Sequence, residues 1–191
     1  MYKRSLVIVS ALFVIFSTFF NTQQFSLSVN TVQAANPTIT AVAGQSKGEV
    51  GASSLANLAY TNAVTSGNQI IVTVQAYRGS SAPTINVPTK ASGTAVIGAF
   101  TQDATYTKNS GSDYFRTDVY RAPITTSGTL TVGLSGTFSF SEAAINEYAG
   151  MAASPVDGAF VTNTGTSATE STGNITTSAP GGMVLMSSTE M

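Results

Sequence analysis

Apolar and polar side chains alternate with a period of two along most of the chain after residue 36, which is the pattern of half-buried β-strands. The clearest case is the segment 69–77 (QIIVTVQAY), whose even-numbered positions are all apolar. In the segment 129–134 (TLTVGL), Leu and Val recur at every second position. Further strands are expected at 38–43, 56–61, 84–87, 100–108, 114–122, 139–148, 158–162, 174–177 and 183–187.

Gly, Ser, Asn and Pro gather between these segments, as in RGSSAP (78–83) and APGG (179–182), and mark turns. Many short strands at this spacing predict an all-β, antiparallel β-sandwich. Only the segment 53–63 also fits a helix, and we assign it to a strand. Thr and Ser account for 28 and 24 of the 191 residues. Because Thr suits a half-solvated pleat, this hydroxyl content agrees with a sheet.

The first 34 residues follow a different pattern. A basic start, MYKR, precedes fifteen uncharged and mostly apolar residues (6–20), which is typical of a secretory signal peptide with a helical core. The small residues of VQA (32–34) predict cleavage before Ala35, leaving residues 35–191 as a single domain. An uncleaved anchor needs about 20 apolar residues, and the polar NTQQ stops the run too early. We therefore expect a secreted or cell-surface protein without a membrane span.

The sequence of the C-terminal region suggests that the domain is unfinished. The apolar segment MVLM (183–186) has the composition of an inner strand, and the sequence ends five residues after it. We expect either a sandwich truncated at this end or a subunit completed by a strand from elsewhere. By contrast, EYAG (147–150) reads as a strand end at which Gly150 takes a positive φ.

Composition excludes several classes of function. The chain has no His, Cys or Trp, so it lacks the commonest general base, the thiol nucleophile and the usual zinc ligands. This excludes Ser-His and Cys-His hydrolases and His-based metalloproteases. A net charge of −1 without a basic block argues against nucleic acid as a partner. We predict a protein that is not an enzyme and has no cofactor.

The candidate binding site lies in a predicted hairpin around the loop 109–112. That loop predicts that Lys108 faces Asp113, Tyr106 faces Phe115 and Asp103 faces Asp118. One face would then be core, formed by Phe100, Ala104, Tyr106, Phe115 and Val119. The opposite face would expose the candidate ligand-binding residues Asp103, Tyr114, Arg116, Asp118 and Tyr120.

An exposed strip of this composition suits a sugar, because tyrosine rings stack on a pyranose while charged groups bond its hydroxyls. The alternative is an ordinary solvated sheet face on which Arg116 offsets two carboxylates. Asp103 with Asp118, or Glu142 with Glu147, would be the acid pair of a glycan-active enzyme fragment, although the odd spacing puts the second pair on opposite faces. The loop oxygens of Asn109 and Asp113 are a calcium alternative, and no other metal site is expected.

Several motifs occur in an order that resembles a known kind of protein. These are GNQIIVTV (67–74), the strand 114–120, GTLTVGLSG (128–136), EYAG (147–150), PVD (155–157) and APGGMVL (179–185). The order resembles the repeated β-sandwich modules, jelly-roll or immunoglobulin-like, of large exported bacterial surface proteins. The resemblance implies adhesion, carbohydrate contact or spacing between domains.

We therefore predict a non-catalytic extracellular binding or adhesion module whose partner is a polysaccharide or another surface component. The alternative is a structural subunit of a surface filament or layer. In that case the segment 36–43 or the C-terminal edge would exchange a strand with a neighbouring module or a second copy.

Overall fold

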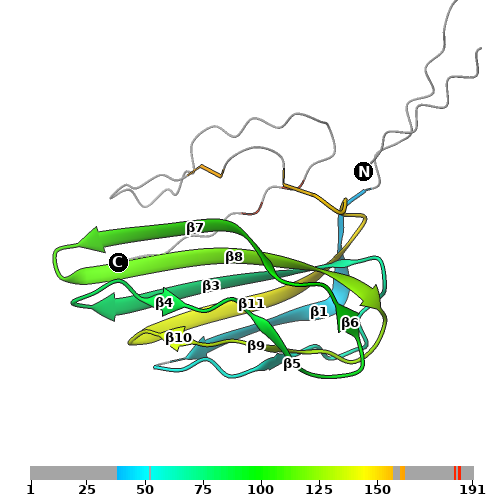
Figure 1. Cartoon of the computed structure of the whole chain (residues 1–191), viewed down its shortest axis with the longest axis horizontal. Coiled ribbons are helices and arrows are strands. Elements are labelled where there is room, and N and C mark those ends of the chain that lie inside the picture. The colour runs from blue at the N-terminus through cyan, green and yellow to red at the C-terminus, as the bar shows by residue number, and fades with distance from the viewer. Residues whose placement is uncertain (1–37, 52, 157–159, 162–182, 184, 186–191) are drawn as a thin grey trace, which may run out of the picture. The chain divides into compact units, whose positions relative to one another are not determined.

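The computed structural model describes residues 38–51, 53–156, 160, 161, 183 and 185 of this chain. These residues form eleven strands, and every pairing between them is antiparallel (Figure 1). The predicted all-β, antiparallel class is confirmed. Within the same residues there is no helix long and apolar enough to cross a membrane.

The largest sheet has the order β1-β11-β3-β8, and β6 and β7 both pair with the far side of β8. Its strands alternate apolar and polar residues, so one face is buried and the other is largely polar. Their bounds are β1 Thr40–Gly51, β3 Gln69–Gly79, β6 Val96–Ile97, β7 Thr101–Ser110, β8 Asp113–Thr126 and β11 Phe140–Ala149.

Two small sheets, β2-β9-β5 and β10-β4, lie across one face of the large sheet (Figure 1). We call this covered side the inner face and the opposite side the outer face. The bounds are β2 Leu58–Ala59, β4 Thr84–Ile85, β5 Thr89–Ser92, β9 Thr131–Gly133 and β10 Gly136–Thr137. A single apolar cluster draws on both layers, which is consistent with a β-sandwich. It includes Leu58, Ile70, Val72, Val74, Ile85, Tyr120, Ile124, Val132, Leu134 and Ile145.

The strands with the clearest alternation were predicted correctly. The even-numbered residues of β3 from Ile70 to Ala76 point into the core, and so do Leu130, Val132 and Leu134 around β9. No strand was predicted at β5, β6 or β10, which contain only two to four residues each. The predicted signal peptide and the strand at 174–177 lie outside the described residues, as do most of 158–162 and 183–187.

The turn between β7 and β8 differs from the prediction. Ser110 pairs with Asp113, so the loop consists of two residues, and Gly111 at φ +62° supplies the left-handed conformation it needs. Lys108 therefore faces Phe115 rather than Asp113. The expected register of this hairpin is wrong by two residues because the turn is shorter than expected.

The end of β11 follows the prediction. Gly150 has φ +76°, and a Cβ atom at this position would collide with the carbonyl of Thr38. Glycine is therefore required here both for its backbone conformation and for the close approach. Beyond Gly150 the chain crosses the outer face, where the Gln69 side-chain amide donates to the carbonyl of Ala152 at 3.4 Å.

Candidate functional site

The strip on β8 lies on the face opposite to the one expected. Tyr114, Arg116, Asp118 and Tyr120 do share one face, as their even spacing predicts, but it is the inner face. Asp118 is completely buried and Tyr120 is 1% exposed. The prediction that these two side chains are exposed is therefore wrong, because the smaller sheets cover this part of β8.

Asp118 is held by three hydrogen bonds and a further ion-pair contact. Its Oδ1 accepts from Thr105 Oγ1 at 2.6 Å and from Arg116 Nε at 2.9 Å. Its Oδ2 accepts from the Tyr120 hydroxyl at 2.8 Å and lies 2.9 Å from Arg116 Nη2. Arg116 thus contacts both carboxylate oxygens, through one charge-assisted hydrogen bond and one ion-pair contact. We call these four residues the Asp118 cluster.

The cluster also perturbs the titration of its members. The hydrogen bond to Asp118 raises the pKa of Arg116, which keeps the guanidinium charged. Burial, with a further contribution from the hydrogen bond to Asp118, raises the pKa of Tyr120. At neutral pH Arg116 is therefore a cation and Tyr120 a neutral hydroxyl donor.

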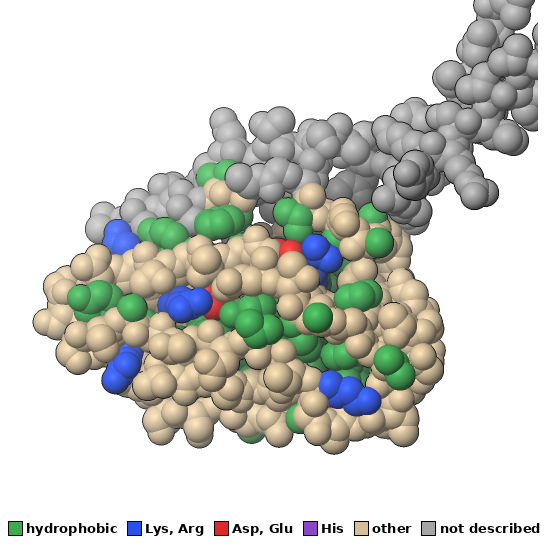
Figure 2. Space-filling view, viewed as in Figure 1, with side chains coloured by type: hydrophobic (Ala, Val, Ile, Leu, Met, Phe, Trp, Pro, Cys, Tyr) green, Lys and Arg blue, Asp and Glu red, His purple; other side chains and the backbone are tan. Residues whose placement is uncertain are grey.

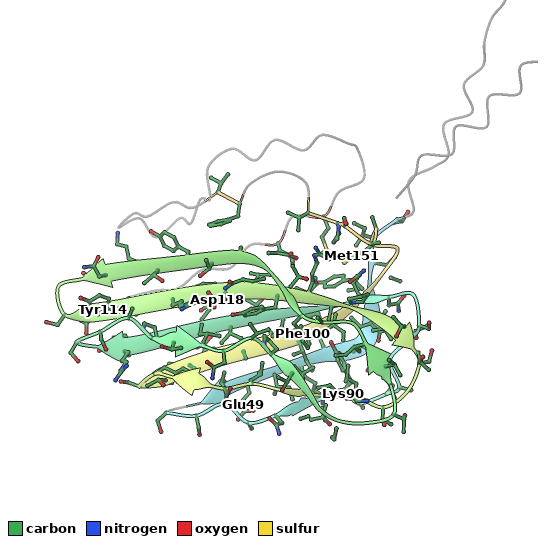
Figure 3. All side chains as sticks on the ribbon, viewed as in Figure 1. Glu49, Lys90, Phe100, Tyr114, Asp118 and Met151 are labelled. Carbon is green, nitrogen blue, oxygen red and sulfur yellow. The ribbon has the colours of Figure 1, made fainter. Side chains whose placement is uncertain are left out.

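The inner face becomes accessible beyond the cluster, toward the β7-β8 turn. Tyr114 pairs with Arg78 on β3 and with Asn109 on β7, and Arg116 follows two residues later on the same face. All of these are at least partly exposed, and the Arg116 side chain is 25% exposed. Figure 3 shows Tyr114 nearer this end of β8 than Asp118. We call Arg78, Asn109, Tyr114 and Arg116 the platform.

Asp103, the fifth predicted site residue, lies on the outer face. A β-bulge between Gln102 and Ala104 inserts it as an extra residue in β7. Its Oδ1 accepts from Arg121 Nε at 2.8 Å. Partial burial raises the pKa of Asp103, and the positive charge of Arg121 opposes that rise. The predicted pairing of Asp103 with Asp118 is wrong, so these carboxylates do not form an acid pair.

The loop oxygens proposed for calcium are also separated. Asn109 lies on the inner face opposite Tyr114, whereas Asp113 accepts a 2.7 Å hydrogen bond from the Tyr77 hydroxyl on the outer face. This bond raises the pKa of Tyr77. Among the residues that the structure describes, no group of three or more acidic side chains is placed to hold a metal ion.

A second buried carboxylate is Glu147, which the sequence suggested only as a possible acid partner of Glu142. It is 1% exposed, and its Oε1 accepts from Thr65 N at 2.8 Å and Asn68 Nδ2 at 2.6 Å. Its Oε2 accepts from Gln45 Nε2 at 3.0 Å. We call these residues the Glu147 cluster. The odd spacing of Glu147 from Glu142 puts the two carboxylates on opposite faces of β11, as the sequence predicted, so they do not form an acid pair.

The structure also has an open apolar pocket of about 450 Å³ at the other end of β8. It lies between the segments 87–90 and 96–100, with Val87 and Val96 more than half exposed. The Lys90 ammonium at its rim donates to the carbonyl of Ala95 at 2.6 Å. The sequence prediction missed this pocket because its walls are formed by a loop and two strands of only two to four residues.

No known family model matches this sequence, and comparisons with curated proteins and with solved structures gave no match. The functional argument therefore depends on the geometry of the chain itself.

Proposed function

We propose that this protein is an exported, non-catalytic binding or adhesion module, a β-sandwich of the jelly-roll or immunoglobulin-like kind, that contacts polysaccharide. The observation that carries the proposal is the platform, where Arg78 lies opposite Tyr114 on β3 and Arg116 lies two residues along β8 on the same face. An aromatic ring offers an apolar face to a pyranose, and planar guanidinium groups bond its oxygens. The predicted signal peptide supports a place outside the cell.

The carboxylates near this surface support binding rather than catalysis. Both oxygens of Asp118 already have two polar contacts each, and the residue is fully buried. Asp103 lies on the opposite face in an ion pair with Arg121. A glycosidase needs two carboxyl groups that flank one bond. Asp118 instead acts as a brace that holds the guanidinium of Arg116 in one orientation.

A glycan array probed with the full chain tests this proposal. We expect the parent protein to retain a subset of polysaccharides and the Tyr114→Ala variant to lose them. Tyr106→Ala is the matched control, because Tyr106 lies on the outer face of the same hairpin, paired with Thr117. A parent protein that retains no polysaccharide would overturn the proposal. So would equal losses in the two variants.

Export has its own test. N-terminal sequencing of material secreted by the source cell should give a chain that begins at Ala35. Recovery of the chain only inside the cell, with Met1 in place, would contradict an extracellular role.

A second candidate function, assembly into a filament or layer, is favoured by the edge strand β1. Within the described sheet β1 pairs only with β11, so its other side is an edge. Lys47 is exposed and Glu49 partly exposed, on either side of Gly48. Two copies of β1 paired antiparallel about Gly48 would place Lys47 of each copy opposite Glu49 of the other. This edge is therefore self-complementary in charge.

Sedimentation velocity over a concentration series tests the assembly function. We expect association of the parent chain, loss of it in Lys47→Glu, and recovery in the double variant Lys47→Glu, Glu49→Lys. A parent chain that stays monomeric at every concentration would rule out this candidate.

A further inference from the structure

The platform carries two positive charges around one aromatic ring. Arg78 and Tyr114 are directly opposed on β3 and β8, and Arg116 is the diagonal neighbour of Arg78. Diagonal positions of this kind lie about 7–8 Å apart, within reach of long side chains. The two guanidinium groups can therefore contact two neighbouring units of a chain molecule laid across Tyr114.

Within the described part of the inner face around Tyr114, Asp118 offsets the charge of Arg116, and no carboxylate is paired with Arg78. Asp118 uses both oxygens inside its own cluster, and Asp113 is on the outer face with Tyr77. Arg116 gives Nε and Nη2 to Asp118, and neither described ion pair involves Arg78. Figure 2 shows this side of the molecule, where the acidic side chains in view touch basic ones while other basic side chains lie apart.

We propose that the platform selects an acidic polysaccharide, with a pyranose ring on Tyr114 and sugar carboxylates on Arg78 and Arg116. Guanidinium groups bind carboxylates through paired, charge-assisted hydrogen bonds, whereas a neutral sugar offers them only hydroxyl groups. The inference rests on the proposed function and adds the charge of the ligand to it. It also predicts binding that weakens with salt, since the platform is exposed.

Two polymers with the same backbone test the inference. Polygalacturonate carries a carboxylate on each sugar, and its fully methyl-esterified form carries none. Calorimetric titration of the full chain should show binding to the acid form and at least tenfold weaker binding to the ester. Single-stranded oligothymidylate, a phosphate polymer, serves as a third probe and should also bind at least tenfold more weakly.

Three variants locate the site. Arg78→Gln removes one charge and should weaken binding to polygalacturonate about tenfold, equivalent to about 1.4 kcal/mol. The affinity of Arg78→Lys for polygalacturonate should lie between those of Arg78→Gln and the parent, because lysine keeps the charge but lacks the planar guanidinium group. Lys108→Gln is the control. It removes one positive charge from the outer face of β7 and should change the affinity less than twofold. Arg78 is in no described ion pair, so the fold should persist.

The outcomes separate this inference from the proposed function. Equal binding to the acid and ester forms would overturn the selection for charge and leave a polysaccharide-binding module. Equal or tighter binding to oligothymidylate would show attraction to polyanions in general and overturn the sugar ligand. Equal losses in Arg78→Gln and Lys108→Gln would overturn the platform as the site. Failure to bind either polymer overturns the inference, and failure on the whole glycan array overturns the proposed function as well.

Discussion

Asp118 and Glu147 are both buried on the inner face of the large sheet, but their donors come from different places. The donors to Asp118 lie within thirteen residues of it, inside one hairpin, and include a cation. The donors to Glu147 are all neutral and lie 79 to 102 residues away in the sequence.

The positions of these donors indicate what each carboxylate does. Glu147 joins the irregular part of β1 and the loop before β3 to β11, so its cluster closes the fold. The Asp118 cluster is local, and its cation reaches the surface, where the Arg116 side chain is 25% exposed. A buried carboxylate with local, charged donors therefore braces a surface group. One with distant, neutral donors holds segments of the chain together.

The largest loss of unfolding free energy is expected when the Glu147 side chain is removed. Glu147→Ala removes the acceptor of one buried hydrogen bond, from Gln45 Nε2, and of two partly buried ones, from Thr65 N and Asn68 Nδ2. We expect a loss of about 3 kcal/mol in the free energy of unfolding, measured by urea denaturation. The control is Glu142→Ala on the exposed side of the same strand, with an expected change of less than about 0.5 kcal/mol. Similar losses in the two variants would contradict the structural role of Glu147.

Removal of Arg116 should have the next largest effect. Arg116→Met leaves the buried charge of Asp118 without its cation, and we expect a loss of about 2 kcal/mol, less than for a fully buried pair. Adding Asp118→Asn removes the unpaired charge and should recover at least half of that loss in the same denaturation experiment. A double variant less stable than Arg116→Met would show that the ion pair is not the main interaction.

The Tyr120 hydroxyl contributes a single hydrogen bond to this cluster. Tyr120→Phe keeps the ring in the core and removes only the 2.8 Å bond to Asp118. We expect a loss of about 1 kcal/mol in unfolding free energy. An unchanged midpoint of urea denaturation would mean that Thr105 and Arg116 satisfy Asp118 without it.

Tyr60→Phe should have the smallest effect on the free energy of unfolding, and this effect should be a gain rather than a loss. The Tyr60 hydroxyl is buried near Glu147 and has no hydrogen-bond partner among the described residues. The variant should be as stable as the parent or more stable, by up to about 1 kcal/mol. Burial raises the pKa of Tyr60 above its ordinary value of 10.0, so the parent loses stability as the pH rises above 10 and the unfolded chain ionises. Tyr60→Phe should lessen this alkaline loss, and an equally steep loss would contradict it.

Much of the fold was predictable because alternation is a local property of the backbone. It located β3, β8, β9 and β11 and showed that Tyr114, Arg116, Asp118 and Tyr120 share a face. It did not show which face is buried, because β8 carries aromatic side chains on both, with Tyr120 on one and Phe115 on the other. The short strands of the small sheets decide that question, and most of them are too short to show a period.

The all-β class, the longer strands and the positive φ of Gly150 could all be predicted from the sequence. Tertiary structure alone decided that Asp118 is buried, that Asp103 lies on the other face, and which residues bind Glu147. The physical reason is distance along the chain. The alternation of apolar and polar residues and the residue types of turns involve only neighbouring residues. Burial instead depends on a second layer of strands. The one residue inserted in β7 moves the side chain of Asp103 to the other face of the sheet.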